Sequence, residues 1–175
     1  IRRPPRSTLF PYRTLFRSGV GGGIYVDGKL ISGFMGAGGE IGHMKLVKDG
    51  KLCGCGQKGC FEAYASATGL IRETTSRLIV NKQNLLYTMI EGKLDTLEAK
   101  DIFDAAKEGD KFSLDLVDYE AEYLAMGIGN ILNIINPEKV VLGGGVAMAG
   151  DILMNPMKEK LKKYALPVTL KGIEI

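Results

Sequence analysis

The sequence contains no apolar run of the roughly 20 residues that a membrane span needs, because Gly, Asn or charged residues interrupt every such stretch. Its 175 residues are 45% hydrophobic and 25% charged, an ordinary composition for one compact globular domain. We therefore expect a soluble protein that has no membrane partner.

Arginine is scarce after residue 18. Five of the seven arginines lie in the first 18 residues, which contain no acidic residue. The formal charge of +3 less these five leaves −2 for the rest of the chain. Nucleic-acid binding depends on clustered basic residues that neutralise phosphates, so this distribution argues against a nucleic-acid partner.

Cysteine and histidine are few, and they lie close together. Cys53, Cys55 and Cys60 follow the only histidine, His43. An odd, clustered set of cysteines argues against a disulfide framework and for a metal site in a reducing cytoplasm. One imidazole and three thiolates form a complete tetrahedral set, which predicts a closed, structural Zn²⁺ site. Free thiols are the alternative interpretation.

The predicted metal site falls in a glycine-rich loop over residues 33–62. A segment with so few side chains cannot hold itself together by packing. A structural zinc ion contributes on the order of 10 kcal/mol to folding, which is enough to order such a loop. We therefore expect the zinc ion to act as a staple.

Residues 1–18 contain a near repeat, Arg-Ser-Thr-Leu-Phe and then Arg-Thr-Leu-Phe, with three prolines and no helical or strand period. They closely resemble translated sequencing-adapter sequence, so we interpret them as non-native and assign the domain to residues 19–175. A targeting presequence is the alternative, but the prolines would interrupt the amphipathic helix that such a signal needs.

Local patterns predict the secondary structure of the domain. Asp27-Gly28 between two β-prone runs predicts a hairpin. Apolar periodicity predicts helices over 62–81 and 98–108, the second closing on Gly109. A long helix has the apolar face Val117, Ala121, Leu124, Ile128, Ile131 and Ile135, and ends at Asn136-Pro137.

After the long helix we expect a strand at 139–142, a turn at Gly143-Gly144-Gly145, a helix at 151–163 and a further strand at 168–175. A strand, a glycine turn and a helix in succession bring backbone N–H groups close to a ligand. Since the chain stops within the last expected strand, we interpret the sequence as incomplete at that end.

Three short motifs together resemble the signature of the ROK (repressor, ORF, kinase) family: Glu40-Ile41-Gly42-His43, Cys53-Gly54-Cys55-Gly56 and Gly59-Cys60-Phe61-Glu62. The resemblance continues to Val141-Leu142-Gly143-Gly144-Gly145-Val146, and so covers essentially all of residues 19–175. Within the family, the sequence is most similar to bacterial glucokinases.

The resemblance implies an α/β fold of the actin-like ATPase type, which is RNase H-like, with this chain as a C-terminal lobe that is truncated at both ends. It also implies that Glu40, His43 and Glu62 bind sugar hydroxyls, and that His43 ligates zinc through its other nitrogen. Taken singly, Glu40 and Glu62 could equally be solvated loop acids, or Glu62 an acid near a helix N-terminus.

Two glycine runs resemble the family's nucleotide-binding segments. Gly19, Gly21 and Gly22 belong to a run similar to the second phosphate-binding loop, although Arg17-Ser18 stands where the family has Gly-Thr. Gly143, Gly144 and Gly145 resemble the adenosine-side motif. A plain strand-to-helix turn is the alternative for this second run.

The function that the resemblance implies for the parent protein is ATP-dependent phosphorylation of glucose, with Mg²⁺, in cytoplasmic carbohydrate metabolism (glycolysis), by a homodimer. The family's general-base aspartate has no match in this sequence, so we expect the chain alone to be inactive. Three alternatives stay open: a sugar-responsive repressor, a kinase for N-acetylhexosamine, mannose or fructose, and a zinc-stapled binding module without catalytic ancestry.

Overall fold

A computed structural model describes residues 19–145 and 147–175; the predicted non-native segment 1–18 and Val146 lie outside the described residues. Short elements come first along the chain, and longer helices follow. In order they are β1 (Tyr25–Val26), β2 (Lys29–Leu30), η2 (Ile41–His43), α1 (Glu62–Ala65), α2 (Ala67–Val80), α3 (Leu85–Met89), η3 (Leu94–Thr96), α4 (Ala99–Lys107), α5 (Lys111–Ile135), η4 (Ala147–Ala149) and α6 (Asp151–Leu161).

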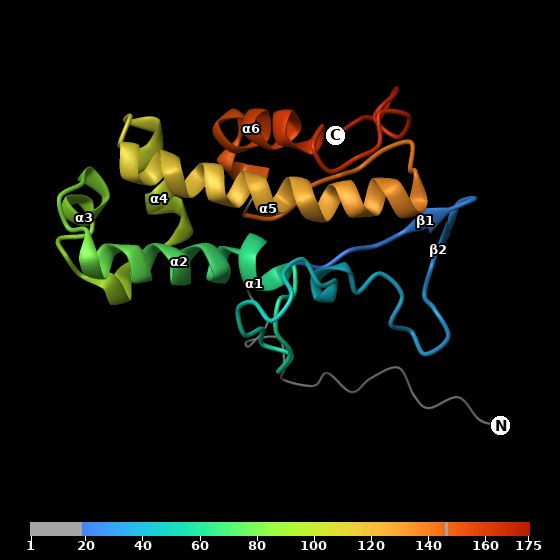
Figure 1. The fold of residues 1–175 in the computed structure, drawn as a ribbon, viewed down its shortest axis with the longest axis horizontal. Coiled ribbons are helices and arrows are strands. Elements are labelled where there is room, and N and C mark those ends of the chain that lie inside the picture. Colours follow the sequence, from blue (N-terminus) through green and yellow to red (C-terminus); the bar gives the residue numbers. More distant parts are fainter. Residues whose placement is uncertain (1–18, 146) are drawn as a thin grey trace.

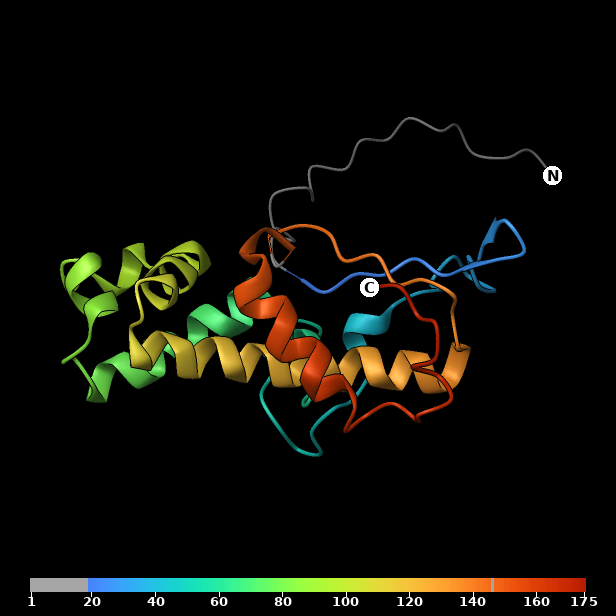
Figure 2. The same ribbon diagram turned by 90° about the horizontal axis from the view of Figure 1, so that it is seen from above.

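Helix α5 runs through the middle of the molecule. Helices α1 and α2 lie on one side of it, α6 crosses it on the other, and α3 and α4 gather near its N-terminal end (Figures 1 and 2). The Asp110 side chain caps α5 by accepting a hydrogen bond from the Ser113 N–H, and Asn136 ends it at a positive φ of 47°. The predicted long helix and its stop at Asn136 are confirmed.

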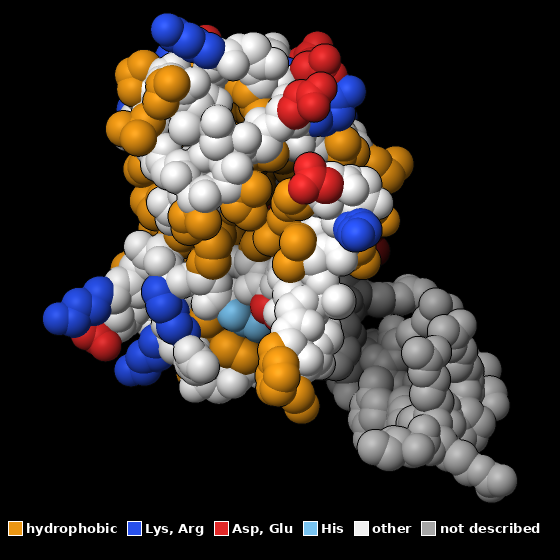
Figure 3. Space-filling view, turned by 90° about the vertical axis from the view of Figure 1, so that its right-hand side faces the viewer, with side chains coloured by type: hydrophobic (Ala, Val, Ile, Leu, Met, Phe, Trp, Pro, Cys, Tyr) orange, Lys and Arg blue, Asp and Glu red, His pale blue; other side chains and the backbone are white. Residues whose placement is uncertain are grey.

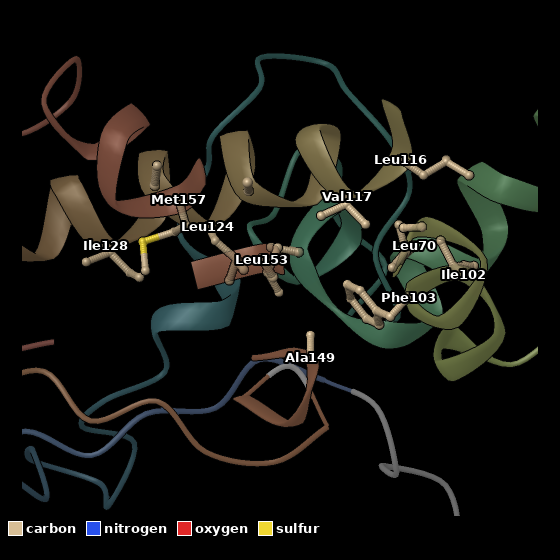
Figure 4. Packing of buried hydrophobic residues seen from close by; sticks show 14 of the residues in the cluster. Leu70, Ile102, Phe103, Leu116, Val117, Leu124, Ile128, Ala149, Leu153 and Met157 are labelled. Atoms are coloured by element: carbon tan, nitrogen blue, oxygen red, sulfur yellow. The ribbon is translucent and has the colours of Figure 1, made fainter. Parts of the chain in front are cut away.

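The hydrophobic core forms around α5. Leu124 and Ile128 of α5 lie in one buried cluster with Leu153 and Met157 of α6, both of which are fully buried (Figure 4). The same cluster continues to Leu70 of α2 and to Ile102 and Phe103 of α4. The apolar face that the sequence predicts is therefore the face on which the other helices pack.

The other helical predictions are borne out except for one break. Helix α4 spans all but the end residues of the predicted 98–108, and Gly109 follows its C-cap residue with a φ of 86°; α6 ends two residues before the predicted Lys163. The single helix predicted over 62–81 is wrong. Ser66 adopts an extended conformation between α1 and α2, because its hydroxyl accepts from Gly69 N–H (3.1 Å) and so caps α2.

The predicted hairpin is confirmed, but the two later strands are not. Tyr25 pairs with Leu30 across the Asp27-Gly28 turn. Segments 139–142 and 168–175 meet only at one parallel bridge, Lys139 to Glu174, and have no other strand partner in the described ranges. A strand needs hydrogen-bonding neighbours along its length, so one bridge does not make a sheet.

None of the helices in the described ranges is long and apolar enough to cross a lipid bilayer.

One buried side chain conflicts with the apolar core. Glu120 of α5 is 0% exposed, and neither carboxylate oxygen has a hydrogen-bond partner among the described residues. Burial raises the pKa of Glu120 well above its usual value, and the partial opposing effect of Lys51 does not cancel it. The folded chain therefore favours the neutral acid. Its stability falls as pH rises above the ordinary glutamate pKa toward the raised value.

We expect Glu120→Gln to remove this pH-dependent cost. The free energy of unfolding of the variant, minus that of the unsubstituted chain, should grow by up to about 1.4 kcal/mol per pH unit above pH ~4.3. Urea unfolding at pH 5, 6 and 7 measures this difference. The exposed Glu108→Gln is the control for losing a carboxylate, and a pH-independent difference for Glu120→Gln would contradict the interpretation.

Candidate functional site

The four predicted metal ligands come together in space. The donor atoms of His43, Cys53, Cys55 and Cys60 all lie within 4.8 Å of one another. The Sγ atoms of Cys55 and Cys60 are 3.7 Å apart, and the Sγ of Cys53 is 3.8 Å from Nδ1 of His43. All three cysteines are free thiols. The structure thus unites residues that stand up to 17 positions apart in the sequence.

The geometry of this cluster fits a zinc ion. With Zn–S bonds of about 2.3 Å, tetrahedral coordination places the sulfur atoms roughly 3.8 Å apart. The distance between the Cys55 and Cys60 sulfur atoms, 3.7 Å, is close to that value, and the set of one imidazole and three thiols suits Zn²⁺. Four protein ligands leave no open position for water or substrate. Such a site would hold the loop together and would take no part in chemistry.

The thiols of the cluster differ in acidity. Burial raises the pKa of Cys53 to about 12; a hydrogen bond from the Cys55 backbone opposes this rise, and side-chain hydrogen bonds with Cys55, Cys60 and Glu62 add to it. A backbone hydrogen bond from Gln57 lowers the pKa of Cys55. Nζ of Lys45 donates a hydrogen bond to Sγ of Cys60 at 3.1 Å. Metal binding at such a site must displace thiol protons.

The loop that carries the cysteines is shaped by tight backbone approaches. Isolated antiparallel bridges join Lys45 to Cys60 and Leu52 to Lys58. Gly59, directly before Cys60, has a φ of 77°, and a Cβ there would lie 1.7 Å from the Val47 carbonyl oxygen. Only glycine fits this position. The glycines of the motif therefore let the sulfur atoms converge.

His43 and Glu40 form the exposed side of the cluster. His43 ends the 3₁₀ helix η2, and its Nε2 lies 3.9 Å from Oε2 of Glu40, which immediately precedes the helix. The Nδ1 of the same ring faces Cys53. One ring nitrogen thus faces the thiols, and the other faces an accessible carboxylate. The two roles predicted for His43, as sugar ligand and metal ligand, stay predictions.

Glu62, the third predicted sugar ligand, lies where two loops meet. Its Oε2 accepts a hydrogen bond from the Val20 N–H (3.3 Å), and its Oε1 accepts from Sγ of Cys53 (3.4 Å). A Cβ on Gly42 would lie 1.9 Å from the Val20 carbonyl oxygen, so the two segments are in close contact. Glu62 is therefore not a solvated loop acid, although it is the first residue of α1.

The two predicted nucleotide-binding glycine runs line one pocket of about 680 Å³. Residues 19–23 and 143–145 border it together with Val140–Leu142. The apolar side chains of Leu124, Ile128, Ile131 and Ile135 of α5 line it from below. The space-filling view shows hydrophobic side chains around a hollow in this face, with the histidine beneath it (Figure 3). The pocket combines backbone amides with an apolar floor, as many ligand sites do.

Sequence reasoning missed two features of this region. Ile131 and Ile135 were interpreted as part of a core helix, yet both are half-buried and line the pocket. Their place near the end of the apolar face, just before Pro137, was the available signal. The second feature is a polar cluster around Lys51, which lies in the loop between His43 and Cys60 that we call the metal loop. Its partners come from α2 and α5, and no local pattern indicated them.

Comparison with known proteins identifies the class. The sequence pattern of the ROK family matches residues 14–170. The chain is also 44% identical over 158 residues to a glucokinase of Halalkalibacterium halodurans, a match that covers 90% of this chain and 48% of the relative. The chain belongs to the ROK family.

A solved structure supports the same assignment at the level of the fold. The chain resembles a ROK family glucokinase from Streptomyces griseus, solved in complex with glucose and AMPPNP, with a TM-score of 0.82 and 31% identity. The likeness covers 90% of this chain and 52% of that one. This confirms the fold of the ROK sugar kinases, the actin-like ATPase type. The chain spans about half the length of the curated relatives that it matches.

Relatives with other functions match as well. An N-acetyl-D-glucosamine kinase of Erwinia tasmaniensis is 35% identical over 86% of this chain and 48% of its own length. A xylose repressor of Caldicellulosiruptor bescii is 31% identical over 90% of this chain and 39% of its own length. Family membership alone therefore does not select among these functions.

We expect the chain to bind about one zinc ion. Metal analysis of the purified 175-residue chain measures this directly. Cys60→Ser should lower the zinc content to background and lower the melting temperature, because three ligands hold zinc more weakly than four. After chelation, added Zn²⁺ should restore the melting temperature while added Mg²⁺, which prefers oxygen ligands, should not. A folded chain that binds no zinc and is unaffected by chelation would exclude the site.

Proposed function

We propose that this chain is the sugar- and nucleotide-binding lobe of an ATP-dependent hexose kinase that converts glucose to glucose 6-phosphate. One observation carries the proposal. Glu62 accepts a hydrogen bond from Val20 of the first glycine run and lies 3.4 Å from Sγ of Cys53. That sulfur is itself 3.8 Å from Nδ1 of His43, so the Glu40–His43 pair lies near the glycine-lined pocket. A sugar held by these residues would lie beside a nucleotide held in the pocket.

The sugar side of the proposal rests on hydrogen-bonding chemistry. Carboxylates accept hydrogen bonds from vicinal hydroxyls, and Glu40 is 67% exposed and available to do so. Zinc bound to Nδ1 of His43 would fix the proton on Nε2, since that nitrogen would keep its hydrogen. Nε2 would then act as a donor beside the Glu40 acceptor. The glucose-bound Streptomyces griseus relative supports this assignment.

The nucleotide side rests on the pocket. The runs Gly19–Gly23 and Gly143–Gly145 offer backbone N–H groups, which suit phosphate oxygens. The apolar α5 residues beneath them suit an adenine ring. ATP would bring Mg²⁺, which offsets phosphate charge during transfer. The AMPPNP bound to the same relative supports a nucleotide in this fold.

The general base would come from outside this chain. Asp27 and Asp49, the two aspartates closest in sequence to the sugar residues, are exposed and occupy turn positions with φ values of 50° and 53°. Turn aspartates of this kind serve the backbone. We propose that the parent protein supplies the aspartate that takes the proton from the sugar hydroxyl, and that the chain alone does not catalyse the transfer.

The cellular setting follows from the ligands and the family. Three free cysteines would stay available to zinc in a reducing compartment, which favours the cytoplasm. We also propose a homodimeric parent that acts in glycolysis. The second candidate function is the body of a sugar-responsive repressor, which the xylose repressor of Caldicellulosiruptor bescii supports.

We expect the chain to bind glucose, and to bind it more weakly after Glu40→Gln. A hydrogen bond to a charged group contributes about 1.5–3 kcal/mol, so the loss should be about ten- to hundredfold in Kd. Isothermal titration with glucose, N-acetylglucosamine and xylose, with and without Mg²⁺–AMPPNP, measures affinity and ranks the sugars. Glu108→Gln is the exposed control and should leave Kd unchanged.

The outcomes of this titration separate the candidates. Tightest binding of glucose together with binding of Mg²⁺–AMPPNP supports the kinase. Binding of xylose without any nucleotide would favour the repressor, and no effect of Glu40→Gln would overturn the sugar site. Formation of glucose 6-phosphate from ATP, above the level of Glu40→Gln, would refute the proposal that the base lies outside the chain.

A further inference from the structure

Lys51 links the metal loop to the helical core. It lies between His43 and Cys53 in the sequence, and its ammonium contacts two helices at once. Nζ donates to Oε2 of Glu73 on α2 and to Oη of Tyr119 on α5, each at 2.5 Å. The Lys51 side chain is only 29% exposed and that of Glu73 only 19%. This is more enclosed than an ordinary surface ion pair.

Aromatic rings complete the enclosure of Lys51. Its backbone N–H donates to Oη of Tyr64 (2.7 Å), and its ammonium lies 5.1 Å and 4.8 Å from the ring centroids of Tyr64 and Tyr119. Tyr64 in turn stacks on Tyr123 of α5 at 4.4 Å. A cation held against two rings gains attraction from both faces. We call Lys51, Glu73, Tyr64 and Tyr119 the loop clamp.

The acidic partner of the clamp is held firmly. Oε1 of Glu73 accepts from Nε of Arg77 (2.8 Å), one helical turn further along α2, while Oε2 accepts from Lys51. Burial opposes ionisation of Glu73, but the hydrogen bonds from Lys51 and Arg77 outweigh it and hold its pKa below the usual value. The carboxylate is therefore held from two sides, by Lys51 of the loop and by Arg77 of its own helix.

Apart from the clamp, the loop is ordered by short backbone hydrogen bonds, such as Cys53 N–H to the Gln57 carbonyl, and by Arg72 of α2, which donates to the Leu52 carbonyl. Between His43 and Cys60 its regular structure consists of the two isolated bridges. Fixing one residue of a free chain costs about 1–2 kcal/mol, so a metal ion that must order the whole loop binds less tightly than one that meets it already ordered. Lys51 is two residues from Cys53 and thereby fixes the loop beside a ligand.

We propose that Lys51 is a positioning residue for the metal site: by docking the loop on α2 and α5, it preassembles His43, Cys53, Cys55 and Cys60 and so raises their affinity for Zn²⁺. The inference rests on the metal site of the proposed function. It assigns to Lys51 the docking of the loop on the helices, which the four ligands do not supply. The competing possibility is that zinc alone orders the loop, with Lys51 as a solvated ion pair of little consequence.

The test is the zinc affinity of Lys51→Met, measured by competition with a chromophoric chelator. Removal of groups that orient metal ligands lowers affinity by about ten- to hundredfold, and we expect a loss in that range. The Lys51 main-chain bonds to Tyr64 and Gly59 remain in this variant. Lys58→Met is the matched control, because Lys58 is an exposed lysine of the same loop, and its affinity should equal that of the unsubstituted chain.

Two further variants test whether the clamp acts as a unit. Glu73→Gln and Tyr119→Phe each remove one partner of Lys51 and should weaken zinc binding in the same direction. Combining Glu73→Gln with Lys51→Met should weaken it no more than Lys51→Met alone, since interacting residues are not additive. Far-UV circular dichroism identifies any variant that has lost its helices. If Lys51→Met has lost its helices, the zinc affinity of Tyr119→Phe, which keeps the aromatic ring, decides whether the clamp positions the metal site.

Each outcome has one meaning. If the unsubstituted chain binds no zinc, the metal site of the proposed function fails first. If it binds zinc and Lys51→Met binds equally well, the positioning role is wrong. Equal losses of zinc affinity in Lys51→Met and Lys58→Met would mean that the effect comes from the net charge of the loop. That result would also overturn the positioning role of Lys51. A loss confined to Lys51→Met, Glu73→Gln and Tyr119→Phe supports the clamp.

Discussion

The burial of one face of α5 is the constraint on which the rest of the structure depends. Helices α1, α2, α4 and α6 all pack against α5, and the apolar cluster between them contains the largest fully buried side chains. Both candidate sites use residues of this helix. Tyr119 and Tyr123 face the metal loop, while Ile131 and Ile135 lie under the glycine-lined pocket. Because the core fixes α5, it fixes both sites.

Glu62 connects the cysteine-bearing loop with the first glycine run. It is the first residue of α1, so the helix packing against α5 sets its position. Its two carboxylate oxygens reach the Cys53 thiol and the Val20 amide. Glu62, a proposed sugar ligand, therefore anchors both the metal loop and the first glycine run. One carboxylate thus connects the Cys53 thiol with the first glycine run.

The sequence predicted the features that depend on residues close to one another along the chain. The α5 face, the Asp27-Gly28 hairpin and the Cys53–Cys60 cluster depend on residues near one another in sequence, and all three were predicted. The break at Ser66 was missed because serine has only modestly lower helix propensity, and its capping bond emerges only in three dimensions. The strand at 139–142 failed because pairing is non-local. Lys51 was missed for the same reason, since its partners lie 22 and 68 residues away.

The shared use of α5 also has a mechanical consequence. An α-helix rises about 1.5 Å per residue, so Tyr119 and Ile135 are about 24 Å apart along a single stiff rod. The metal loop and the pocket floor cannot slide past one another unless that rod bends. Within this chain, a movement that narrows the pocket would therefore involve the other segments that border it, the glycine runs at 19–23 and 143–145, rather than a displacement of the α5 floor relative to the metal loop.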